Sequence, residues 1–280
     1  MDDQRVTTGS ADSAPAGWLG QLTLGFERRD GRTVLATRRH RGPFTVQRAF
    51  YPEEDYPHVY LLHPPGGVVG GDRLELSVNM GIGSHALLTM PGATKFYRSA
   101  GAQARLTQRF TLAENSILEW LPQGNIFFPG AKVVMESEFT LRPGARLLGF
   151  ETLCFGRPVM DEGFELGQLN SLLRINLPHH PGLYERLRID DGDLGKLANY
   201  PLNAIFFAAP ASEAMLDAVR ELLNEANSPA AGASLLDSML VVRLLDNDNQ
   251  RLQSLLQRFW LRLRPMMLGR EAVIPRIWST

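Results

Sequence analysis

The sequence predicts a mainly β protein, built as a β-helix-like, solenoid-like stack of many short strands with two α-helices near the C-terminus. Three observations predict this class. Apolar and polar residues alternate over most of residues 20–210, which is the pattern of half-buried strands. The 280 residues include 26 glycines and 18 prolines, which suits many tight turns. A weak internal repeat also runs through the strand region, and short repeats are typical of stacked coils.

The alternation is clearest in residues 105–112, where leucine and phenylalanine alternate with arginine and threonine. Residues 133–141 repeat it with glutamates on the polar side, and residues 166–177 and 183–189 continue it. Turn clusters such as PGG, GIGS, AENS, PQGN and RPGA separate these runs. Each run therefore predicts one strand bounded by turns.

The internal repeat relates three segments. FTLAENSILEW (110–120) aligns with FTLRPGARLLG (139–149) at an offset of 29, and with VNMGIGSHALL (78–88) at an offset of 32. Each segment is a strand end, a short turn and the start of the next strand. Stacked β-coils produce this spacing, because each coil buries its inner face against a neighbour. Hairpins of a β-sandwich produce similar spacing, so the sandwich is the alternative that we favour less.

The C-terminal third predicts two amphipathic helices. Residues 212–226 place an apolar stripe on one face after Ser212 as N-cap, and residues 248–264 form a second stripe that Pro265 is expected to end. Residues 232–245 are apolar almost throughout, so helix and strand stay open there. No linker composition divides residues 18–280, which we expect to be a single domain.

Composition limits the classes of function. Residues 1–17 lack the basic start and apolar core of a secretory signal, so they are expected to be a disordered tail and the protein cytoplasmic. The net charge of −1 gives no attraction to nucleic acid or to a membrane surface, and no apolar run is long enough to span a bilayer. The single cysteine, Cys154, excludes an internal disulfide and a thiolate-rich metal site, and its apolar setting predicts a buried, inert thiol.

A glycine-rich stretch, HPPGGVVGGD (63–72), is the most unusual segment. A phosphate-binding loop needs a lysine and a hydroxyl after its last glycine, whereas Asp72 stands there and would repel phosphate. The residues that follow alternate like a strand, which argues against a dinucleotide fingerprint. We therefore expect a stiff turn whose aspartate binds nearby amides.

No segment predicts a resident metal centre or an active site. His63, Asp72 and His85 are the nearest set of ligands in the β region, but their spacing fixes no geometry, so only a weak, transient metal site stays open. No nucleophile elbow and no identifiable carboxylate pair is present. Lys95 and Arg98 in MPGATKFYRS form either an anion site or the polar side of a strand.

Five motifs occur in a fixed order: HPPGGVVGGD, MPGATKFYRS, LEWLPQGNIFFPGA, LLGFETLCFGRP and LGREAVIPRIWST. Together they resemble the urease accessory proteins of the UreD family, called UreH in some bacteria, over about residues 20–280. The family's fold, a β-helix-like stack with a few helices near the C-terminus, agrees with the pattern above.

The resemblance implies a non-catalytic chaperone for metallocentre assembly, which acts with UreF and, through UreF, with the GTPase UreG on the urease apoprotein. It implies nickel in transit and no permanently bound cofactor, with neither nucleic acid nor membrane as a partner. Matching motif residues that it suggests for partner contact are Pro65, Gly66, Gly67, Gly70, Gly71, Lys95, Tyr97 and Arg98. Residues that it suggests for a nickel path are Asp72, His63, His85, Glu119 and Glu151.

Two other classes stay open from the sequence. One is a carbohydrate-active enzyme on a β-solenoid, which needs a carboxylate pair in a groove. The other is a β-rich adaptor unrelated to urease. For each residue of the nickel path, a purely structural role is the alternative.

Overall fold

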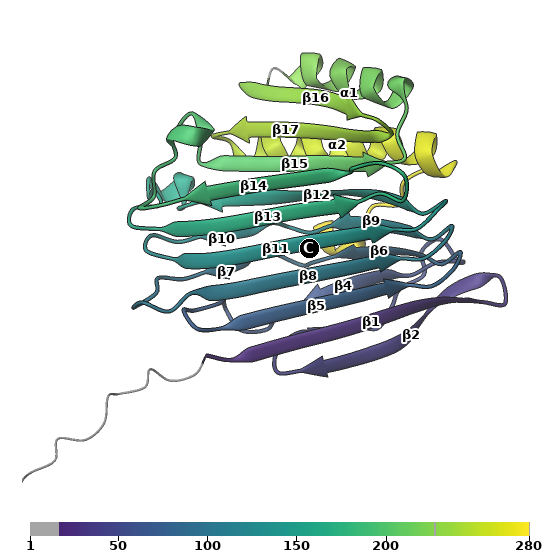
Figure 1. Cartoon of the computed structure of the whole chain (residues 1–280), viewed down its shortest axis with the longest axis horizontal. Helices are drawn as coiled ribbons and strands as arrows, with labels where there is room; N and C mark the ends of the chain where they lie inside the picture. The colour runs from purple at the N-terminus through teal and green to yellow at the C-terminus, as the bar shows by residue number, and fades with distance from the viewer. Residues whose placement is uncertain (1–16, 227, 280) are drawn as a thin grey trace, which may run out of the picture.

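The computed structural model describes residues 17–226 and 228–279. Two large β-sheets face each other, and both helices pack on the outside of one of them (Figure 1). The prediction of a disordered tail over residues 1–17 lies outside the described residues except for Gly17. No described helix is long and apolar enough to cross a membrane.

The first sheet has seven strands in the order β14-β13-β11-β8-β5-β1-β2. Strands β1, β5, β8, β11 and β13 run parallel, while β2 and β14 pair antiparallel at the two edges. The strands are β1 (Leu19–Arg29), β2 (Arg32–Arg41), β5 (Arg73–Met80), β8 (Ala104–Leu112), β11 (Lys132–Leu141), β13 (Gln168–Asn176) and β14 (Leu183–Ile189).

The second sheet has ten strands, eight of them in the order β16-β17-β15-β12-β9-β6-β4-β3. The short strand β10 pairs with β12, and the short strand β7 pairs with β10. They are β3 (Thr45–Val46), β4 (His58–Leu62), β6 (His85–Thr89), β7 (Thr94–Phe96), β9 (Ile117–Leu121), β10 (Asn125–Phe127), β12 (Arg146–Phe155), β15 (Leu202–Ala209), β16 (Ala230–Leu236) and β17 (Met239–Asp246). The predicted strands at 105–112, 133–141, 166–177 and 183–189 correspond to β8, β11, β13 and β14.

The chain passes from one sheet to the other and back, so that each coil lies on the previous one for about 4 turns. The register between coils reproduces the internal repeat. Val78 lies beside Phe110, and Phe110 lies beside Phe139, which are the predicted offsets of 32 and 29. The solenoid-like prediction is therefore confirmed.

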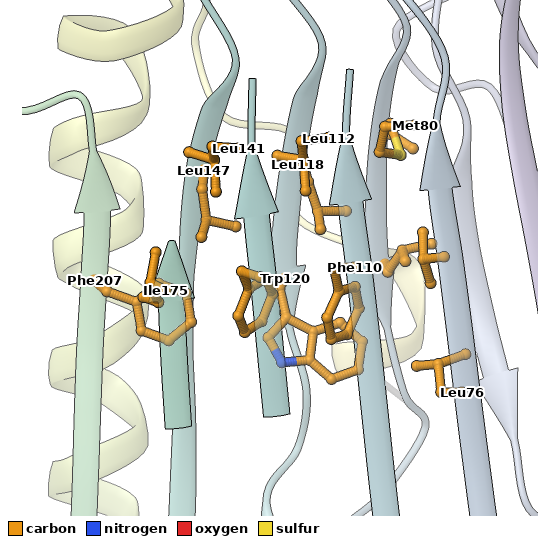
Figure 2. Close-up of a cluster of buried hydrophobic side chains, with 14 of the residues drawn as sticks. Leu76, Met80, Phe110, Leu112, Leu118, Trp120, Leu141, Leu147, Ile175 and Phe207 are labelled. Carbon is orange, nitrogen blue, oxygen red and sulfur yellow. The ribbon is translucent and has the colours of Figure 1, made fainter. Parts of the chain in front are cut away.

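The main core fills the space between the sheets. Inward side chains of successive coils stack on one another, as Figure 2 shows for Phe110, Trp120 and their neighbours. The rings of Phe110 and Phe139 are nearly parallel, with centroids 4.3 Å apart. Alternation along each strand places the polar residues on the opposite face.

Helix α1 (Glu213–Ala226) and helix α2 (Asn249–Leu268) confirm the two predicted helices. The side chain of Asp248 caps α2 by accepting a hydrogen bond from Arg251 N at 3.0 Å. The apolar stripe of α2 packs on the ten-stranded sheet and forms a second core there.

In this region one prediction is wrong, and one segment that was left open between helix and strand is assigned. Pro265 does not end α2, which continues to Leu268 and ends at Gly269 in the left-handed region. The neighbouring Arg264 is anchored to two buried carboxylates, and these contacts hold the last turn although proline lacks an N–H. The undecided segment 232–245 falls in the hairpin of β16 and β17.

Candidate functional site

The stretch 63–72 carries the chain from β4 in one sheet to β5 in the other. Asp72 closes it by accepting two backbone hydrogen bonds, from Trp18 N to Oδ1 at 2.8 Å and from Val69 N to Oδ2 at 3.0 Å. Both carboxylate oxygens therefore bind amides, as predicted for a stiff turn. In this structure Asp72 ties the start of β1 to the turn.

The second motif, MPGATKFYRS, packs directly on the first. Tyr97 donates its hydroxyl hydrogen to Gly66 O at 3.0 Å. A Cβ atom at Gly67 would lie 2.3 Å from Tyr97 Cε2 and 2.7 Å from Lys95 O, so only glycine fits there. Gly71 adopts a φ of 95°. The residues predicted as family motif, Pro65 to Gly71 with Lys95 and Tyr97, thus form one packed unit.

Arg98 lies slightly apart from this unit. Its side chain passes over Gly130, where an added Cβ would lie 3.1 Å from Arg98 Cγ. It contributes to a separate surface pocket with Lys132 and Glu165. The exposed Lys95, in contrast, lines the cavity that adjoins the first motif.

Three cavities adjoin one another through shared lining residues, and strands of both sheets line the central and the far one. The central cavity, of about 240 Å³, is lined by His63, Lys95, Gln108, Trp120 and Glu151 among others. The motif cavity, of about 330 Å³, is lined by His63 together with Trp18 and Asp72. The far cavity, of about 370 Å³, is lined by Glu151 together with Glu185, Lys196 and Arg243. His63 and Glu151 each line two of these cavities, so both lie at the boundaries between them.

Glu151 is a buried carboxyl group between the two sheets. It projects from β12 toward the seven-stranded sheet, where Gln108 Nε2 donates to Ser137 Oγ at 2.9 Å. Burial raises the pKa of Glu151 to about 7, while hydrogen bonding from Ser137 and Trp120 opposes the rise. Among the described residues, neither Glu151 Oε1 nor Trp120 Nε1 has a hydrogen-bond partner of ordinary geometry. Such an orphaned pair in a cavity wall is unusual and needs an explanation.

His63 is half-buried at the other boundary of the central cavity. Burial lowers the pKa of His63, and the negative charge of Asp72 partly offsets that effect. The neutral imidazole, which is the form that binds metals, is therefore favoured near neutral pH.

His85 and Glu119 lie elsewhere, beneath helix α2. His85 Nε2 is 2.9 Å from Glu119 Oε1, and Glu119 Oε2 accepts hydrogen bonds from Trp260 Nε1 at 2.7 Å and Arg264 Nε at 2.9 Å. Glu119 is 0% exposed. Both carboxylate oxygens of Glu119 are therefore occupied by contacts with other side chains of the protein.

This buried set extends to the loop before β4, and we call Glu53, His58, His85, Glu119 and Arg264 the helix-side cluster. Arg264 Nη2 donates to both oxygens of Glu53 at 2.8 Å, and Glu53 Oε1 is 3.2 Å from His58 Nε2. Burial lowers the pKa of Arg264, and the charge and hydrogen bonds of Glu53 oppose this. The cluster links α2 to the three strands β4, β6 and β9 and to the loop before β4.

Sequence reasoning missed Glu53, His58 and Arg264. One signal was present: Arg264 stands four residues after Trp260 and directly after Leu263, on the apolar stripe of the helix. A charged residue in such a stripe indicates a buried partner.

The five residues predicted for a nickel path thus fall in three places. His63 and Asp72 line the motif cavity, Glu151 lies between the central and far cavities, and His85 and Glu119 belong to the helix-side cluster. Over residues 17–226 and 228–279, no three His, Cys, Asp or Glu side chains converge as a metal-binding group. Cys154 is half-buried, and burial raises the pKa of its thiol to about 11, which agrees with the inert thiol expected.

Comparison with known proteins identifies the family. The family model described as UreD urease accessory protein matches residues 19–279. The chain is 61% identical over 265 residues to the urease accessory protein UreD of Pseudomonas putida strain KT2440, covering 95% of each chain. It is 57% identical to that of Pseudomonas entomophila, covering 95% of this chain and 96% of the relative.

A more distant relative, the urease accessory protein UreD of Klebsiella aerogenes, is 48% identical over 264 residues, covering 94% of this chain and 97% of the relative. These names describe an accessory role, which confirms that the chain is not an enzyme and excludes the carbohydrate-active enzyme and the adaptor unrelated to urease. The five ordered motifs and the observed fold agree with this result. The chain belongs to the UreD family of urease accessory proteins.

Proposed function

We propose that this protein is a cytoplasmic, non-catalytic metallochaperone scaffold that supports nickel insertion into the urease apoprotein, in a complex with UreF and the GTPase UreG. The family and the names of the relatives support a role in urease maturation. Nickel is cargo in this proposal and is not a resident cofactor.

The observation that carries the proposal is the position of Glu151. This carboxyl group is buried between the two sheets and lines the central cavity on one side and the far cavity on the other. Its Oε1 accepts no hydrogen bond of ordinary geometry from any described residue. His63 has the corresponding place between the central and motif cavities. An ion that passes between the sheets would meet an imidazole and then a carboxylate.

A transfer path needs ligands that bind the ion weakly enough to release it. Isolated oxygen and nitrogen ligands, spaced along a cavity, satisfy this better than a convergent cluster, which would retain the ion. Glu151 fits this role because no hydrogen bond of ordinary geometry from a described residue occupies its Oε1. Glu119 fits less well, because His85, Trp260 and Arg264 occupy both of its oxygens. Asp72 likewise binds two amides, so we assign it to the turn.

The test is co-expression of urease with and without this chain, followed by measurement of nickel in purified urease. We expect nickel content to depend on the chain, and Glu151→Gln or His63→Ala to lower it while complex formation with UreF and apo-urease persists. Glu114→Gln, an exposed position in the turn after β8, is the matched control. If nickel content does not depend on the chain, the function is wrong. If E151Q behaves like E114Q, the path past Glu151 is wrong and the accessory role stands.

A further inference from the structure

The outward face of the seven-stranded sheet is rich in arginine although the whole chain is almost neutral, with a net charge of −1. Both helices contact the other sheet, so this face is not covered by either of them (Figure 1). The strand register and burial pattern place these outward-facing arginines on it: Arg39, Arg41, Arg73, Arg105, Arg109, Arg174, Arg186 and Arg188. We call this set the arginine face.

Carboxylates on the same rows of the sheet are fewer, namely Glu75, Glu136 and Glu138. Arg174 pairs with Glu138 at 3.5 Å, and Arg188 pairs with Asp190 at 2.8 Å. For the other six arginines, no ion pair with any described residue is present. Their guanidinium groups therefore have no ion-pair partner within the described part of the chain.

One pair of neighbouring arginines shows that the stability of the fold alone does not account for the arginine face. Arg73 on β5 and Arg105 on β8 are direct register partners in neighbouring parallel strands, and both are exposed. Like charges at adjacent positions of a sheet destabilise it. Polar uncharged residues would suit these two solvent-facing positions better, so the retained charges point to something that they bind.

From this geometry we infer that the arginine face docks on a carboxylate-rich surface of the urease apoprotein. The inference rests on the proposed function for the identity of the partner. Charge complementarity supports an acidic surface, because guanidinium groups form paired hydrogen bonds with carboxylates. The interspersed glutamates argue against nucleic acid, since Glu75, Glu136 and Glu138 would meet phosphates at close range. A mixed charge pattern instead fits a protein surface with its own mixture of charges.

The substitution that tests it is Arg73→Gln with Arg105→Gln in one chain. Because this change also removes the repulsion between the two guanidiniums, we expect the free energy of unfolding to be unchanged or higher. Arg48→Gln with Arg142→Gln is the matched control: both are exposed outside the sheet strands, and neither forms an ion pair with a described residue. Urea unfolding of both variants checks that the fold is intact.

Binding of each full-length variant to immobilised apo-urease is then measured at about 50 mM and about 300 mM salt. We expect the wild-type chain to lose affinity as salt rises, and R73Q/R105Q to bind about tenfold more weakly at low salt with a flatter salt dependence. The control should stay within about twofold of wild type. A second variant, R39Q/R41Q on the edge strand, should weaken binding in the same direction.

Other results would overturn the inference. Equal binding by R73Q/R105Q and the control excludes the arginine face as the docking surface, while the proposed function stands if the chain still raises the nickel content of urease. A wild-type chain that does not bind apo-urease at low salt excludes the docking inference and also counts against urease as a partner. Tighter binding to a DNA duplex than to apo-urease, lost in R73Q/R105Q, would assign the face to nucleic acid.

Discussion

Glu119 and Arg264 form a fully buried ion pair, 2.9 Å from Oε2 to Nε, although 145 residues separate them in the sequence. Glu119 belongs to a central strand of the ten-stranded sheet, and Arg264 belongs to the last turns of α2. A second ion pair joins Arg270 to Asp55 with two bonds of 2.6 Å. The C-terminal region is thus held to the sheet and to the loop before β4 by charge as well as by apolar packing.

We expect Arg264→Ala to lower the free energy of unfolding by about 3–5 kcal/mol, because the carboxylates of Glu53 and Glu119 stay buried without their counter-charge. Arg262→Ala, two residues earlier and 57% exposed, should change it by less than about 0.5 kcal/mol. Urea unfolding followed by circular dichroism measures both. Equal effects for the two variants would show that the helix-side cluster is not a stabilising element.

Glu151 makes stability depend on pH in a definite direction. Its pKa is about 7 in the folded protein against an ordinary value of 4.5, so the folded state holds the proton more tightly. The contribution of this group is therefore fully present below about pH 4.5 and is lost as pH rises to about 7. At about pH 8, the free energy of unfolding of E151Q should exceed that of wild type by about 3 kcal/mol, and the difference should vanish below about pH 4.

Urea unfolding of both proteins across this pH range checks the prediction, with Glu136→Gln as the exposed control. A difference between wild type and E151Q that stays constant with pH would contradict the raised pKa. A reversed trend would mean that the ionised carboxylate is stabilised by groups other than Ser137 and Trp120.

The contact between the two motifs predicts different results for two adjacent glycines. Gly67→Ala should destabilise the protein by about 1–3 kcal/mol, because the new Cβ overlaps the Tyr97 ring and Lys95 O. At Gly66 the nearest atom to an added Cβ is Tyr97 Oη at 3.9 Å, so Gly66→Ala should be nearly neutral. Thermal unfolding of the two variants makes the comparison. Equal melting temperatures would contradict the packing of Tyr97 on Gly67.

Asp72→Ala removes the acceptor for Trp18 N and Val69 N. We expect a loss of about 1–3 kcal/mol and faster proteolysis near the start of β1, because a charged acceptor of two amides disappears. The nickel content of urease should fall only as far as the amount of folded protein falls. A loss of nickel with unchanged stability would instead return Asp72 to the transfer path.

Much of the fold could be predicted from local pattern. The offsets of 29 and 32 between similar segments are the actual register of Phe139, Phe110 and Val78, because stacked coils place equivalent residues beside one another. The two helices followed from their apolar stripes. The prediction for the end of α2 was wrong. Pro265 was expected to end the helix, but contacts with carboxylates that are distant in the sequence hold its last turn.

The site could be predicted only in part. The glycine motif and Asp72 were identified because turn chemistry is local. The pairing of Arg264 with Glu53 spans 211 residues and leaves no spacing signal in the sequence. Glu151 appeared only as one of several carboxylates, because its position between two cavities depends on how the sheets face each other.

The buried pair of Glu119 and Arg264 also has a consequence for biosynthesis. The ribosome makes the chain from its N-terminus, so Glu119 and its strand emerge long before Arg264 and the last turns of α2. Until then the carboxylate has no guanidinium to pair with, and burial would cost several kcal/mol. The outer surface of the ten-stranded sheet therefore stays hydrated on the nascent chain, and its coverage by α2 is a late, essentially post-translational step.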